Sequence, residues 1–104
     1  MKPLIDQVLG DVLEICGPLG VEVVRELRYG VPSRVTVQVR GEGDSCEVVL
    51  YSGAFSTENE GLGSDLDGRL IRLLSKAPYA LIEHTRGVAF GNAYKVALRR
   101  KGQE

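Results

Sequence analysis

The sequence lacks most of the features from which a function can be inferred directly. It has no tryptophan and a single histidine, and it contains no G-x-S-x-G, P-loop, dinucleotide-binding or EF-hand pattern. Its two cysteines, Cys16 and Cys46, do not form a C-x-x-C pair. We expect both to be small buried apolar residues, with a disulfide or a reactive thiol as the alternatives. We therefore predict no catalytic, cofactor-binding or metal-binding residues, and an enzymatic function is not expected.

A long apolar run is also missing. Asp6, Asp11 and Glu14 interrupt the amphipathic stretch near the N-terminus, so this stretch is neither a membrane span nor a signal peptide. We therefore expect a cytoplasmic protein that does not bind a membrane.

What the sequence does contain is typical of one ordinary domain. Of its 104 residues, 43% are hydrophobic and 26% are charged, which is the balance of a globular protein. We predict a single domain over residues 1–104, in which residues 99–104 form a frayed tail.

Apolar periodicity predicts an α+β fold with the element order α-β-β-β-α-β-β. Apolar residues at helical spacing predict a first helix from about Leu4 to Cys16, and we expect Ile5, Leu9, Val12 and Leu13 to contact the sheet. Gly10, in the middle of this helix, suggests close packing against a neighbour.

Alternating residues predict five strands, with the clearest alternation at Val35, Val37 and Val39. The predicted strands cover residues 21–29, 34–40, 46–51, 79–85 and 88–98, with turns at 30–33, 41–44 and 86–87. A second helix is predicted over 65–76, with Ser64 as its N-cap. The expected architecture is a five-stranded, largely antiparallel sheet with both helices on one face.

The connection over residues 52–64 shows no periodicity and contains three glycines. We expect it to be the most mobile internal segment, and a binding site could be built around it. Glu58, Glu60, Asp65 and Asp67 nearby would repel a phosphate, and helix capping and solubility explain them better than a cation site does. His84 is interpreted as a boundary residue near a strand end.

Charge is segregated along the chain although the net charge is only −1. Residues 41–68 contain seven acidic and no basic residues, whereas residues 69–101 contain eight basic residues and one acidic residue. Either the two segments neutralise each other within one chain, or they present complementary patches to a partner.

These patterns favour a non-enzymatic protein-binding or assembly module that self-associates as a homodimer, with another protein as a possible further partner. One alternative is a nucleic-acid-associated protein that uses its basic C-terminal strand, and another is a small-molecule binder or enzyme built around residues 52–64. The candidate partner-binding residues are Phe55, Glu58, Glu60, Arg86, Lys95, Arg99 and Arg100.

Overall fold

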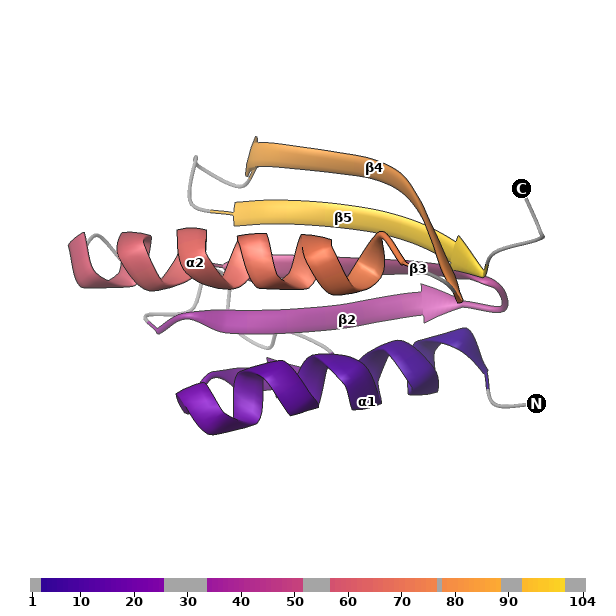
Figure 1. Ribbon diagram of the computed structural model, residues 1–104, viewed down its shortest axis with the longest axis horizontal. Coiled ribbons are helices and arrows are strands. Elements are labelled where there is room, and N and C mark those ends of the chain that lie inside the picture. The colour runs from indigo at the N-terminus through magenta and orange to yellow at the C-terminus, as the bar shows by residue number, and fades with distance from the viewer. Residues whose placement is uncertain (1–2, 26–33, 52–56, 77, 89–92, 101–104) are drawn as a thin grey trace.

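A computed structural model of the chain describes residues 3–25, 34–51, 57–76, 78–88 and 93–100 (Figure 1). Within these ranges, the side chains of residues 57–60 and 86–88 lie outside the description. The elements are α1 (Leu4–Cys16), a 3-10 turn η1 (Gly17–Leu19), β1 (Glu22–Val24), β2 (Thr36–Glu42), β3 (Ser45–Tyr51), α2 (Thr57–Leu74), β4 (Tyr79–Val88) and β5 (Ala93–Arg100).

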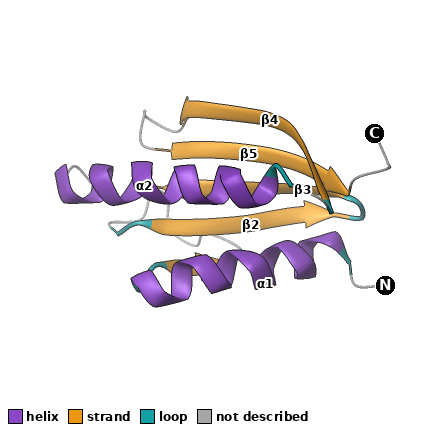
Figure 2. Cartoon of the chain, in the orientation of Figure 1, coloured by secondary structure: helices purple, strands orange, loops and turns teal. Residues whose placement is uncertain are grey.

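The described elements form one five-stranded sheet with α1 and α2 on the same face (Figure 2). The strand order is β1-β2-β3-β5-β4, and every neighbouring pair is antiparallel except β1 and β2, which are parallel. This confirms the predicted α+β class, the element order and the placement of both helices.

The first strand is shorter than predicted. It covers only Glu22–Val24, and its parallel pairing with β2 means that the two strands are not joined as a hairpin. The turn predicted at 30–33 lies outside the described residues.

The predicted turn at residues 86–87 is wrong, because β4 continues through these positions to Val88. The β4–β5 register shifts between Arg86 and Val88, so Gly87 is accommodated as a bulge in the strand rather than as its end. The predicted tail is wrong at its start, since Arg99 and Arg100 belong to β5.

Helix α1 packs through a row of side chains that only partly overlaps the predicted one. Val12 is fully buried as predicted, and Ile5 and Leu9 are partly buried against the core, but Leu13 is 47% exposed. The most buried row is Leu4, Val8, Val12 and Cys16. The two rows are adjacent on the helix, so periodicity alone does not distinguish them. The sheet side of the packing is as predicted, because Val35, Val37 and Val39 are all buried in the core.

Helix α2 begins at Thr57, eight residues before the predicted start at 65, so the predicted loop is wrong over 57–64. Residues 52–56 lie outside the description, and Ser64 is an exposed helical residue rather than an N-cap. The apolar stripe of the helix extends back to Leu62, which packs against the core together with Leu66 and Leu70.

The core lies between the helices and the sheet, and both cysteines contribute to it. Cys16 and Cys46 are free and buried, which confirms the prediction that they are buried residues.

Candidate functional site

Strand β4 forms one edge of the sheet, and the three-residue β1 forms the other. Leu81 on β4 is 38% exposed and Ile82 is 53% exposed. Ile82 stands at a register shift between Leu81 and Glu83, so it has no paired residue on β5. Strand β4 is therefore an edge strand of ten residues that carries two exposed apolar side chains, and such an edge can pair with another strand.

Next to this edge, the face of the sheet away from the helices is polar. Glu83 pairs in register with Ala97, and Thr85 pairs with Lys95, so all four side chains share that face. The Thr85 hydroxyl donates to Oε1 of Glu83 at 2.9 Å. The Lys95 ammonium lies 3.8 Å from Oε1 of Glu47 on β3.

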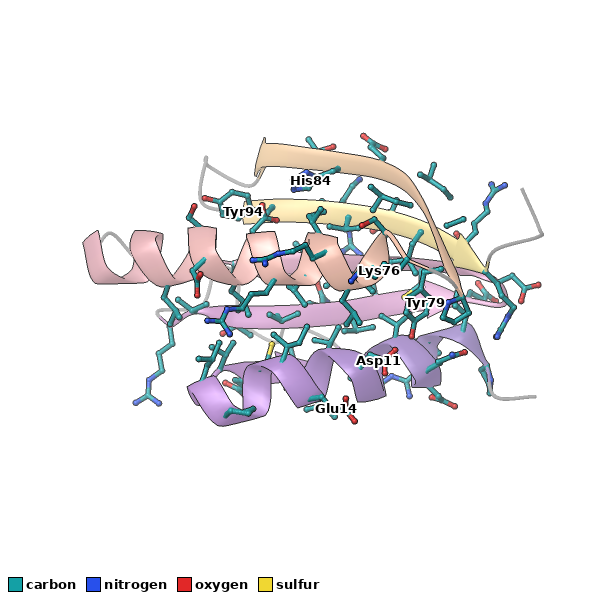
Figure 3. All side chains as sticks on the ribbon, in the orientation of Figure 1. Asp11, Glu14, Lys76, Tyr79, His84 and Tyr94 are labelled. Atoms are coloured by element: carbon teal, nitrogen blue, oxygen red, sulfur yellow. The ribbon has the colours of Figure 1, made fainter. Side chains whose placement is uncertain are left out.

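On the helix-covered face, His84 of β4 (Figure 3) contacts Asp67 of α2. Its Nε2 lies 3.0 Å from Oδ1 and 3.2 Å from Oδ2 of Asp67, and the Asp67 side chain is only 4% exposed. The contact joins the middle of the edge strand to the helix above it, so it helps to fix how β4 is presented.

A histidine–carboxylate pair can also serve acid–base catalysis, but that role needs a nucleophile or a bound substrate in reach. The ring of His84 is engaged with the carboxylate of Asp67. No group of three His, Cys, Asp or Glu side chains in the described ranges could hold a metal ion. The pair links β4 to α2 through Nε2 of His84.

A second polar group joins α1 to the other end of the sheet. The Tyr79 hydroxyl donates a hydrogen bond to Asp11 (Figure 3). The Arg100 guanidinium donates to Oε1 of Gln7 at 3.2 Å. Burial, and next the hydrogen bond to Asp11, raise the pKa of Tyr79 well above its ordinary value. The hydroxyl is therefore held in its neutral, donating form.

Of the predicted partner-binding residues whose side chains are described, Arg100 does not share a face of the sheet with Lys95 and Arg99. Lys95 and Arg99 lie on the face away from the helices, whereas Arg100 lies on the opposite face with a side chain only 14% exposed. Arg86 lies in β4, and Glu58 and Glu60 lie in the first turn of α2, but these three side chains are outside the description. Phe55 is among the residues that are not described.

Part of the segregated charge is neutralised within the chain. Because β3 and β5 are antiparallel neighbours, the acidic residues of β3 and its preceding turn meet the basic residues of β5. Lys95 contacts Glu47, and Nε of Arg100 lies 3.9 Å from Asp44. Within α2, Arg69 contacts Asp65 at 3.1 Å.

Sequence reasoning missed the contact of Asp67 with His84 and the exposure of Ile82. Asp67 lies in the helix one position after the buried Leu66, and that adjacency to the core stripe was the only available signal. For Ile82, the consecutive apolar residues Leu81 and Ile82 break the alternation of the strand, which is a signal of a bulge.

Comparison with models of known families, with curated proteins and with solved structures finds no match to this chain. None of the helices in the described ranges is long and apolar enough to span a membrane. Function is therefore inferred from the geometry of the described residues.

Proposed function

We propose that the protein is a non-enzymatic assembly module that associates with a second copy of itself through the edge of β4. The exposed edge carries this proposal. Apart from its ladder with β5, β4 makes one backbone hydrogen bond among the described residues, from Tyr79 N to Lys76 O at 2.9 Å. An edge strand presents a row of backbone donors and acceptors to which another strand can add.

The exposed side chains support the same surface. Ile82 and Leu81 would lose water contact when another strand docks, and burial of apolar area is the main driving force of association. Because β5 lies between β3 and β4, the edge on this side of the sheet is β4. The opposite edge, β1, offers only three residues.

The two register shifts in β4 limit how long the added ladder can be. Bulges twist and interrupt a strand edge, and charged side chains such as Glu83 protect it from indiscriminate pairing. We therefore expect a small interface and a weak, reversible dimer whose population rises with protein concentration.

Light scattering over a concentration series tests this function. We expect the wild-type mass to rise from monomer towards dimer, and Ile82→Asp to remain monomeric because it places a charge on the docking edge. Leu13→Asp is the matched control, since Leu13 is a similarly exposed apolar residue on α1. A wild-type monomer at every concentration up to millimolar would reject self-association. Loss of the dimer in Leu13→Asp but not in Ile82→Asp would move the interface to α1.

A further inference from the structure

The regular part of β4 restricts how two copies of this edge can pair. Between the two register shifts, residues 83–86 pair continuously with β5. If two copies of this run pair antiparallel about a two-fold axis, opposing residues must lie on the same face of the sheet. Because neighbouring residues alternate between faces, one residue must oppose its own copy across the axis, and the two interior choices for that residue are His84 and Thr85.

Charge distinguishes the two choices. With the axis at His84, Glu83 of one copy opposes Thr85 of the other, and Lys95 stands next to Thr85 in the same row. With the axis at Thr85, the two copies of Thr85 oppose each other. The Lys95 side chain beside each threonine then points towards its counterpart in the other copy. The axis at His84 therefore brings Glu83 of each copy near Lys95 of the other, which pairs opposite charges twice. The axis at Thr85 brings two lysines together, which pairs like charges.

We propose that two copies join β4 to β4 in antiparallel fashion about an axis at His84, with Glu83 of each copy facing Lys95 of the other. This inference rests on the proposed function and adds its geometry. Neighbouring strands lie about 5 Å apart, so β5 of one copy, which carries Lys95, is about 10 Å from β4 of the other, which carries Glu83. A lysine and a glutamate side chain can span this gap together.

Lys95 can turn towards such a partner without leaving Glu47 unpaired. The carboxylate of Glu47 is held more closely by Arg40, whose Nε lies 2.7 Å from Oε2. The contact between Lys95 and Glu47 is the longer one, at 3.8 Å. The Lys95 side chain is also 29% exposed.

Charge exchange tests the pairing. We expect Glu83→Lys and Lys95→Glu each to raise the dimer dissociation constant about tenfold or more, because attraction becomes repulsion at two places. The double variant, which exchanges the charges, is expected to return close to the wild-type value. Glu42→Lys is the matched control, since this exposed glutamate of β2 lies far from the edge in strand order.

The outcomes separate this inference from the proposed function. Ile82→Asp could abolish the dimer while the two charge variants and their combination leave its dissociation constant unchanged. In that case the proposed function stands and the axis at His84 is wrong. If the wild type does not dimerise at all, both are wrong. Circular dichroism of each variant confirms that the fold is retained.

Cysteine cross-linking tests the same axis without depending on charge. Opposing residues in an added strand have Cα atoms about 5 Å apart, which suits a disulfide. A mixture of the Glu83→Cys and Thr85→Cys variants is therefore expected to form a mixed disulfide dimer faster than either variant forms one alone. Faster cross-linking of Thr85→Cys with itself would place the axis at Thr85 and overturn the proposal.

Discussion

His84 in the edge strand is bonded through Nε2 to both carboxylate oxygens of Asp67, a residue of α2 with a nearly buried side chain. The two residues are 17 positions apart in the chain and join β4 to the helix above it. A buried carboxylate that loses a hydrogen-bond partner carries a desolvation cost that its remaining contacts must offset. The pair therefore contributes to stability and to the orientation of the proposed docking edge.

Removal of this contact is expected to destabilise the fold. His84→Ala should lower the free energy of unfolding by about 1–3 kcal/mol, and Asp67→Asn should also lower it. In a double-mutant cycle followed by urea denaturation, we expect a coupling energy of about 0.5–3 kcal/mol. Additive single effects would show that the two side chains stabilise the protein independently.

The bond between Tyr79 and Asp11 ties the start of β4 to the middle of α1. Tyr79→Phe removes the donor and leaves Asp11 without it, so we expect a loss of about 1–2 kcal/mol in unfolding free energy. Asp11→Asn should cost less, because the amide oxygen can still accept the bond. Equal losses in both variants would indicate that the charge of Asp11, rather than its role as an acceptor, is what matters.

The sheet was predictable because its signal is local. The core-facing side of a strand needs apolar residues at alternate positions, such as Val35, Val37 and Val39, and this pattern is visible without any partner. The parallel pairing of β1 with β2 was not predictable, since it depends on a crossover rather than on residues within either strand. The same applies to the identity of the edge strand, which follows from β5 inserting between β3 and β4.

The errors in α2 have a different cause. Gly61 and Gly63 favour a loop in the sequence because glycine is costly within a helix. Leu62 between them is partly buried and packs against the core, and a helix forms over both glycines. The sequence predicts that Asp67 is a solvated charge near the start of a helix, where the helix dipole favours an acidic side chain. Its actual role depends on His84, and no spacing rule connects these two positions.

Two glycines are expected to respond in opposite ways to the same substitution. Gly10 is exposed within α1, and an added Cβ would meet no atom within 4 Å, so the close packing suggested by the sequence is wrong. Gly10→Ala should therefore raise the free energy of unfolding by about 0.5–1 kcal/mol, through higher helix propensity and a more restricted unfolded chain.

At Gly41 the added Cβ would lie 2.3 Å from the carbonyl oxygen of Ser45 and 2.8 Å from Cα of Cys46. Both atoms belong to the backbone of β3, so the ladder between β2 and β3 would have to shift. We expect Gly41→Ala to lower the free energy of unfolding by about 1–3 kcal/mol. Thermal denaturation of both variants, measured side by side, checks the opposite signs.

Cys16 and Cys46 are expected to make the stability of the fold fall at alkaline pH. Burial raises the pKa of each thiol from 9.0 to about 11, with the charge of Glu47 adding to the effect at Cys46. The thiols thus keep their protons in the folded state at a pH at which the unfolded chain has lost them. Their contribution to stability is fully present below pH 9.0 and is lost as the pH rises to about 11.

Urea denaturation at intervals from about pH 8 to about pH 11 measures this loss. We expect Cys16→Ala and Cys46→Ala each to reduce the steepness of the decline, because each variant removes one proton-linked group, even though each also lowers stability at neutral pH by creating a small cavity. Folded wild-type protein at neutral pH should also react slowly with a thiol reagent, since only the thiolate is nucleophilic. Identical slopes in all three proteins, together with rapid labelling of either cysteine, would show that the thiols are not held protonated by the core.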